Sequence, residues 1–179
     1  MKKRKSFLKP KRKGSEDNAE ISLHAMDGCV TTQTIRLKGH INNKPVSILI
    51  DTGSTHNFVD PKVVQRTGLL LMPQPSFNVR IAGDDKLQSE GLCQSVTIKC
   101  QGKEIIADFH ILPIGGCQMV LGVELLQKFK AVTLSYKDQN VKLSSGSNVW
   151  EFQGIQTGEI ELVQAESMDK SVMDCVCVL

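Results

Sequence analysis

The sequence predicts an all-β, barrel-like domain that carries one or two short helices. From residue 31 to residue 144, short apolar segments recur about every 8–12 residues, and turn residues separate them, as in small β-barrels. Only two segments have helical spacing. Aromatic residues make up only 4% of the chain, and β-branched residues are plentiful. These observations together favour a small closed β-structure.

The first strands and the first helix follow from local signals. "TTQTIRLKGHI" alternates in polarity, "NNKP" is a turn, and "VSILI" is a short buried strand. In "DPKVVQRTGL", Asp60 is the expected N-cap, Pro61 the first helical residue and Gly68 the stop. The chain therefore begins with a hairpin and continues into a short helix.

The remaining elements form hairpins and a second strand–helix unit. "FNVRI" is a strand followed by the hairpin turn "AGDDK", and "LQSEGLCQSVTIKC" pairs with "EIIADFHIL" through "QGK". "CQMVLG" is another buried strand, "VELLQKF" the second helix, and "AVTLSY" with "VKLS" a closing hairpin. We expect the domain to occupy residues 21–145. Residues 146–179 are expected to be a largely irregular extension, with one strand-like stretch, "GEIELVQAE".

Charge separates the N-terminal tail from the domain. Eight of the 22 basic residues lie within the first 13 positions, so residues 14–179 carry 14 basic and 19 acidic side chains. Residues 1–20 are expected to be a disordered tail. Two interpretations of this tail remain open: a nuclear localisation signal or nucleic-acid tether through residues 2–13, and a solubilising arm or linker.

The composition also excludes several classes of protein. No apolar run approaches the roughly 20 residues that span a bilayer. Lys9-Pro10 directly follows Phe7-Leu8, so a secretory signal is not expected. We therefore expect an intracellular protein, cytoplasmic or nuclear, with reduced thiols. Cysteines 29, 93, 100 and 117 are interpreted as small buried apolar residues, and Cys175-Val-Cys177 lacks the partners of a metal site.

The strand "VSILI" ends at an ionisable residue, Asp51, in "DTGST". An unpaired carboxylate is costly to bury, but Gly53 permits a tight turn whose N–H groups point at it. The hydroxyls of Thr52 and Ser54 are further potential donors. Such a loop would hold a carboxylate rigidly, as catalysis requires. An ordinary turn is the alternative, because Asp-Thr-Gly is short and typical of turns.

A second element repeats the order of the first. In "MVLGVELL", a strand leads through Leu121-Gly122 into a helix, as "VSILI" leads through the Asp51 loop into a helix. The second element has no acidic residue at the equivalent place.

These two elements resemble the retroviral-type aspartic peptidases, especially the protease domains of gypsy-type LTR-retrotransposon polyproteins of plants. The resemblance covers about residues 21–143, with "ISLHAMDG", "TIRLKGHINNKPVSILIDTGSTHNFVDPKVVQRTGL" and "FHILPIGGCQMVLGVELLQKFKAVTLSYKDQNVKL" as its main pieces. It implies a retropepsin-like closed barrel, half of a pepsin, that is active as a twofold homodimer.

The resemblance also implies roles for individual residues. Asp51 would be the catalytic carboxylate, Thr52 would lock the two catalytic loops together, and Gly53 would contact substrate through its backbone. Leu121 and Gly122 would support the loop from beneath. The hairpin at Ile81, Ala82, Gly83 and Asp84 would be the flap over the substrate.

The chain departs from the viral pattern at three places. Val123 stands where viral members usually have Arg, and Thr55 follows Ser54 where an acidic residue is common, so the usual ion pair is missing. The flap is polar and has only one glycine, Gly83.

The mechanism of this class needs two carboxylates that share a proton, one activating water and the other polarising the scissile carbonyl. A chain with one such loop is therefore expected to pair its Asp51 with that of a second copy. The resemblance implies peptide hydrolysis, with its own polyprotein as the expected substrate, at acidic to near-neutral pH without metal or organic cofactor.

The other acidic residues and His56 are expected to have structural roles. Asp84 and Asp85 are expected at a hairpin tip, Asp108 on an outward-facing strand position, and Asp60 as a helix cap. His56 is expected to be structural. Two other functions remain open: a catalytically inactive module for dimerisation or protein binding, and a nucleic-acid-associated protein that acts through its basic tail.

Overall fold

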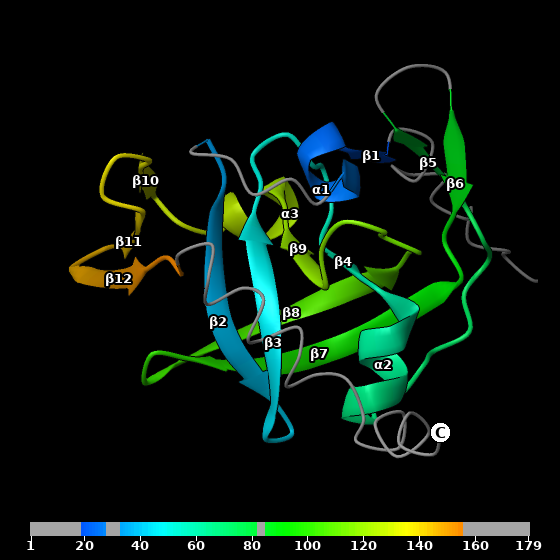
Figure 1. Cartoon of the computed structure of the whole chain (residues 1–179). Helices are drawn as coiled ribbons and strands as arrows, with labels where there is room; N and C mark the ends of the chain where they lie inside the picture. Colours follow the sequence, from blue (N-terminus) through cyan, green and yellow to red (C-terminus); the bar gives the residue numbers. More distant parts are fainter. Residues whose placement is uncertain (1–18, 28–32, 82–84, 156–179) are drawn as a thin grey trace, which may run out of the picture.

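The computed structural model describes residues 19–27, 33–81 and 85–155 (Figure 1). In this part of the chain the fold is mostly β: six strands close into a barrel, and the helices are three and short. The predicted all-β, barrel-like class is confirmed. None of the described helices is long and apolar enough to cross a membrane.

The barrel has the strand order β2-β3-β9-β4-β8-β7. Its hairpins are antiparallel, whereas β3 pairs with β9, and β4 with β8, in parallel. The β2–β3 turn contains Asn42 and Asn43 with positive φ of 49° and 63°, a backbone that asparagine tolerates better than most residues. The barrel strands are β2 (Ile35–Ile41), β3 (Lys44–Ile50), β4 (Phe58–Val59), β7 (Gly91–Cys100), β8 (Lys103–Ile111) and β9 (Met119–Leu121).

The helices follow local signals where these exist. In α2 (Pro61–Thr67), the Asp60 side chain accepts from the Lys62 N–H, and Gly68 ends the helix in the left-handed conformation at φ 69°. The prediction for this helix is confirmed at both ends. α3 (Val123–Leu126) begins where expected but ends before the last three residues of "VELLQKF", and α1 (Leu23–Asp27) was not predicted.

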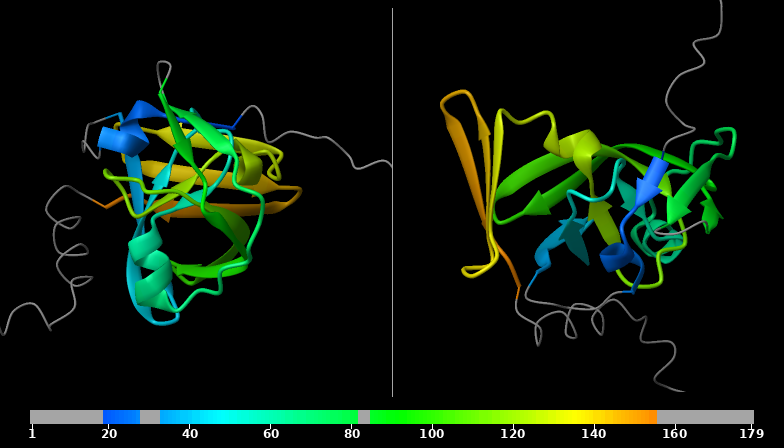
Figure 2. Two further views of the ribbon diagram at one scale, coloured as in Figure 1. Left: turned by 90° about the vertical axis from the view of Figure 1, so that its right-hand side faces the viewer. Right: turned by 90° about the horizontal axis from the view of Figure 1, so that it is seen from above.

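Two three-stranded sheets flank the barrel (Figure 2). The first adds β1 to the expected flap hairpin, and the second extends the expected closing hairpin by one strand. They comprise β1 (Ala19–Ile21), β5 (Asn78–Ile81) and β6 (Lys86–Gln88), and β10 (Ala131–Ser135), β11 (Asn140–Ser145) and β12 (Asn148–Gln153).

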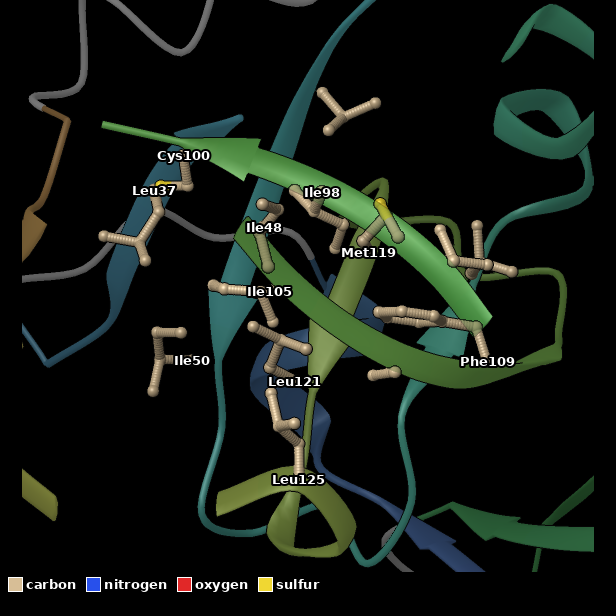
Figure 3. Close-up of a cluster of buried hydrophobic side chains, with 14 of the residues drawn as sticks. Leu37, Ile48, Ile50, Ile98, Cys100, Ile105, Phe109, Met119, Leu121 and Leu125 are labelled. Atoms are coloured by element: carbon tan, nitrogen blue, oxygen red, sulfur yellow. The ribbon is translucent and has the colours of Figure 1, made fainter. Parts of the chain in front are cut away.

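The main core fills the barrel interior. Figure 3 shows side chains from several barrel strands and from α3 converging on this interior, each of them at most 6% exposed. The labelled members are Leu37, Ile48, Ile50, Ile98, Cys100, Ile105, Phe109, Met119, Leu121 and Leu125. On β3 and β9, residues that face the barrel interior alternate with residues that face outward. The outward-facing Leu49 and Val120 belong to a second apolar cluster.

Strands are also present outside the expected domain of residues 21–145. Ala19 and Glu20, expected in the tail, lie in β1. Asn148–Gln153, expected in an irregular extension, forms β12, because it pairs along β11 and places Phe152, which is fully buried, in the barrel core. Residues 1–18 and the stretch "GEIELVQAE" lie outside the described residues.

Candidate active site

Asp51 lies at the end of β3, where β3 and β9 run parallel and end side by side. Its backbone N–H donates to the carbonyl of Leu121, the last residue of β9, at 3.0 Å. Only 8% of Asp51 is exposed. The parallel pair thus fixes the start of the Asp51 loop on the second element.

Three donors hold the Asp51 carboxylate. The Gly53 N–H donates to Oδ1 at 2.9 Å, and the Ser54 hydroxyl donates to Oδ2 at 2.6 Å. The Ser22 hydroxyl donates to the same Oδ2 at 2.5 Å. A Cβ on Gly53 would lie 3.2 Å from Oδ1 and from the Ser22 Cβ, a tight contact that glycine avoids. Main-chain and Ser54 donors follow the expectation from the motif, while Ser22 was not predicted.

Thr52 does not join these donors within the described structure. Its side chain is exposed and lines a pocket of about 530 Å³ on the open side of the carboxylate. The pocket is lined by Ser22, His24, Gln33, Thr34, Leu49, Ile50, Asp51, Thr52, Gly53 and Tyr136. A rigid carboxylate therefore faces a space large enough for part of a ligand.

Gly122 lies against the backbone of the Asp51 loop. A Cβ at this position would lie 2.6 Å from the Ser54 carbonyl oxygen, so no other residue fits. The next two N–H groups, of Val123 and Glu124, donate to the carbonyls of Ser54 and Thr55 at 2.8 and 3.0 Å. The structure thus brings Leu121 and Gly122 together with the loop, as expected for the supporting element.

Asn57 and Glu124 join the two elements through a buried network that sequence reasoning missed. Asn57 is 1% exposed, and its Oδ1 accepts from the Gly122 N–H at 3.0 Å. Its Nδ2 donates to Glu124 Oε2 at 3.2 Å and to the Asp108 carbonyl at 3.1 Å. This amide–carboxylate contact connects the Asp51 loop with the start of α3. Asn57 ends the polar stretch "STHN" directly before "FV", so the local pattern did not distinguish it from its neighbours.

Only part of the expected flap can be located. Ile81 ends β5, and its N–H donates to the Asp85 carbonyl at 2.9 Å, which confirms a hairpin between β5 and β6. Ala82, Gly83 and Asp84 lie outside the described residues. Asp85 is exposed.

The other candidate residues have structural partners. Asp60 caps α2, and its second oxygen accepts from the Ile114 N–H at 3.1 Å. Asp108 Oδ1 accepts from the Ser95 N–H at 2.7 Å. His56 contacts Thr55 Oγ1 through Nδ1 at 2.8 Å and packs its ring near that of His110. Within the described residues, no hydrogen bond joins a second carboxylate to Asp51.

The described thiols are unsuited to nucleophilic or metal chemistry. Cys93, Cys100 and Cys117 are buried, as predicted, and are free thiols in the described structure. Cys29 lies outside the described residues. Burial raises the pKa of the Cys100 thiol to about 11 and that of the Cys117 thiol to about 12, so both stay protonated at neutral pH. In the part of the chain that the structure describes, His, Cys, Asp and Glu side chains form no cluster of three or more that could hold a metal ion.

Comparisons with known proteins bear on the family and the fold. The family model described as retroviral aspartyl protease matches residues 22–148. No curated protein has significant similarity to the chain. The structure resembles the retroviral protease-like domain of Ddi1 from Leishmania major, with 15% identity, a TM-score of 0.51, and coverage of 69% of this chain and 96% of that domain. This likeness supports the fold.

Two further solved structures are similar at lower scores. A retropepsin-like aspartic protease from Rickettsia conorii has 19% identity and a TM-score of 0.41, with 57% of this chain and 76% of that chain covered. The EIAV protease in complex with an inhibitor has 21% identity and a TM-score of 0.40, with 54% and 88% covered.

Proposed function

Because the chain belongs to the retroviral aspartyl protease family, we propose that it is an aspartic endopeptidase whose catalytic carboxylate is Asp51. The main observation is the Asp51 carboxylate itself: it is held by three hydrogen bonds at a strand end and faces a pocket of about 530 Å³. Rigid placement of a carboxylate beside an accessible space is what activation of a water molecule requires.

The second carboxylate of the reaction comes, in this proposal, from a second copy of the chain. One ionised Asp51 takes a proton from water, whose oxygen adds to the scissile carbonyl carbon, while the partner's protonated Asp51 donates to the carbonyl oxygen. Return of a proton to the amide nitrogen then accompanies C–N cleavage, giving a carboxylic acid and an amine. Two carboxylates a few ångströms apart share one proton, so their titration belongs to the pair.

The test compares the full-length protein with Asp51→Asn. This change keeps the size of the side chain but removes its charge. Cleavage of a denatured protein at pH 4–7, with and without pepstatin, is expected to fall at least about 10³-fold in the variant. Asp108→Asn is the matched control, because the amide retains the oxygen that accepts from Ser95. Equal cleavage by wild type and Asp51→Asn contradicts the proposal.

Sedimentation at rising protein concentration tests the shared site. A peptidase that is monomeric at every active concentration contradicts a dyad built from two Asp51 residues. Specific activity is expected to rise with protein concentration until the dimer is saturated.

The biological setting is a finer proposal that rests on the sequence pieces around Asp51. We propose a gypsy-type retrotransposon origin and the chain's own polyprotein as substrate, in an intracellular compartment. Residues 2–13 offer a weak contact for nucleic acid. Cleavage of a flanking polyprotein, compared with an unrelated denatured protein, tests the substrate.

A catalytically inactive dimerisation or protein-binding module is the second candidate. It is favoured by one observation: Oδ2 of Asp51 already accepts two hydroxyl hydrogen bonds, and the residue is 8% exposed. Stable dimers without cleavage, in both wild type and Asp51→Asn, would support this candidate.

A further inference from the structure

Residues 19–22 lie extended between the expected flap strand and the Asp51 loop. On one side, β1 pairs in parallel with β5, with Ala19, Glu20 and Ile21 opposite Val79, Arg80 and Ile81. Figure 1 shows β1 beside β5, with α1 following it at the same end of the barrel.

On the other side, the same segment bonds to the Asp51 loop. The Glu20 N–H donates to Thr55 Oγ1 at 2.8 Å, and the Thr55 N–H donates to the Glu20 carbonyl at 3.0 Å. The backbone of this short segment is therefore hydrogen-bonded on both edges, and the Thr55 side chain supplies one of the acceptors.

The side chains of this segment alternate between buried and outward positions. Ala19 and Ile21 are each 2% exposed and belong to an apolar cluster with Leu49, Phe58 and Val120. Glu20 lies between them, and its carboxylate accepts from Arg80 at 2.9 Å near the surface. Leu49, Phe58 and Val120 belong to strands β3, β4 and β9, and we call the apolar surface that they form the cleft face.

Immediately after β1, the chain crosses the catalytic carboxylate. The Ser22 hydroxyl donates to Asp51 Oδ2 at 2.5 Å, and the Ser22 N–H donates to the Ser54 hydroxyl oxygen at 3.1 Å. Residues 19–22 thus combine an extended backbone, alternating side-chain burial and a backbone position over the carboxylate.

An extended peptide bound by strand addition has these same features. We propose that residues 19–22 occupy the peptide-binding cleft of their own chain as an intramolecular ligand, which must leave before another peptide binds. This inference rests on the proposed role of Asp51 in a polypeptide-binding site. Since the segment is covalently attached, its effective concentration is high, and a free peptide competes only weakly while it is seated.

The occupant also indicates what the cleft accepts. The buried positions hold a small apolar and then a β-branched apolar side chain, separated by an outward acidic one that meets Arg80. A hydroxyl then meets Asp51. The cleft is therefore suited to peptides with the order small apolar, acidic, aliphatic, hydroxyl.

The first test locks the segment in place. In an Asp51→Asn background, Glu20→Cys with Arg80→Cys puts cysteines at opposed positions of β1 and β5. The probe is a fluorescent synthetic peptide with the sequence of residues 17–24. The oxidised protein is expected to bind it at least tenfold more weakly than the reduced protein. Equal affinity in both states overturns the inference.

A matched pair controls for the redox treatment. Lys99→Cys with Glu104→Cys lies at opposed positions of β7 and β8, on barrel strands. This pair is expected to show no redox dependence of peptide binding. A similar redox effect in both pairs also overturns the inference.

The second test releases the segment by substitution. Ile21→Asp introduces a charge at a position that is 2% exposed, and Ile21→Val is the conservative control. Ile21→Asp is expected to bind the peptide at least tenfold more tightly than wild type.

The Cys117 thiol reports on release of the segment, because it donates to the Ala25 carbonyl of α1 at 3.4 Å. Its alkylation, followed by mass spectrometry, is expected to accelerate in Ile21→Asp only.

The two proposals fail separately. Redox-dependent peptide binding without cleavage by the wild type contradicts the peptidase function but supports this inference. Cleavage by the wild type together with redox-independent peptide binding supports the peptidase function but contradicts this inference. If Ile21→Asp does not fold, the cysteine pair decides alone, because its oxidised and reduced forms have the same sequence.

Discussion

Strands β3 and β9 are buried on both faces, but different parts of the chain cover these faces. On the barrel face, Ile48 and Leu121 pack in the interior against other barrel strands. On the cleft face, Leu49 and Val120, each at most 1% exposed, pack in the cluster with β1 and α1. The barrel face is covered by other barrel strands, whereas the cleft face is covered by residues 19–27, the covering segment, together with Val79 of β5 and residues 112–117.

The two faces are therefore expected to have different roles: the barrel face stabilises the fold, and the cleft face controls access to Asp51. Residues 19–27 contain no barrel strand, so we expect this segment to detach without opening the barrel and to contribute little to global stability. Substitutions on the barrel face should therefore change the free energy of unfolding, and those on the cleft face should mainly change access to Asp51.

Gly122→Ala is expected to have the largest effect on stability, because Gly122 directly follows β9 and lies against the backbone of the Asp51 loop. Its Cβ would collide with backbone atoms of the Asp51 loop, including the Ser54 carbonyl oxygen at 2.6 Å. Backbone cannot move aside as a flexible side chain does, so we expect a loss of at least about 3 kcal/mol, or failure to fold. Urea unfolding measures it. Gly115→Ala, whose Cβ would meet only the Met26 carbonyl oxygen at 3.7 Å, should be nearly neutral.

Two adjacent residues of β3, Ile48 and Leu49, allow the cost of truncating a side chain to be compared between the two faces. Ile48→Ala leaves a cavity in the barrel core and is expected to cost about 2–5 kcal/mol of unfolding free energy. Leu49→Ala, one residue on, is expected to cost less than about 1.5 kcal/mol, because the covering segment can detach and limit the loss. Both residues are at most 1% exposed, so burial alone predicts equal costs. Equal losses in urea unfolding would contradict the comparison.

Substitutions of Ser54 and Ser22 compare the effects on activity of two hydroxyl groups that donate to the same carboxylate oxygen. Both hydroxyls reach Asp51 Oδ2, one from the loop and one from the covering segment. Ser54→Ala should lower kcat/KM about 10–100-fold, since a hydrogen bond to a charged group contributes roughly 1.5–3 kcal/mol. Ser22→Ala should instead raise kcat/KM severalfold, because it weakens the segment that occupies the cleft. A loss of activity in both variants would mean that Ser22 only positions the carboxylate.

The features that could be predicted from the sequence are those whose partners are close along the chain. The cap of α2 joins Asp60 to Lys62, and the Asp51 loop bonds within three residues. Hairpin turns likewise depend on local residues such as Asn42 and Asn43. The strand ending at Asp51 was recognisable because a continuous apolar run indicates burial on both faces.

The features that were missed depend on partners far along the chain. β1 pairs with β5 about sixty residues away, and the two-residue strand β4 is defined only by its neighbours β8 and β9. Asn57 bonds to Gly122, 65 positions on. An apolar run shows that a face is covered, but it does not identify the covering segment, so the occupied cleft was not predictable.

The smallest expected effect is the alkaline pH dependence of two buried thiols, one on each face. Burial raises the pKa of Cys100, in the barrel core, from 9.0 to about 11, and that of Cys117, in the cleft cluster, from 9.0 to about 12. The unfolded chain loses these protons first, so stability is complete below pH 9 and decreases as pH rises through 11 and 12.

Comparing pH 8 with pH 10 should therefore distinguish the two faces. Wild type should lose about 1 kcal/mol more unfolding free energy over this interval than Cys100→Ala, which has no such thiol. Cys117→Ala should differ less from wild type, because the detachment of α1 exposes the Cys117 thiol without unfolding the barrel. Urea unfolding at both pH values measures these differences, and the other titrating groups cancel between variants. If Cys117 contributes as much as Cys100, the segment on the cleft face is as firmly held as the barrel.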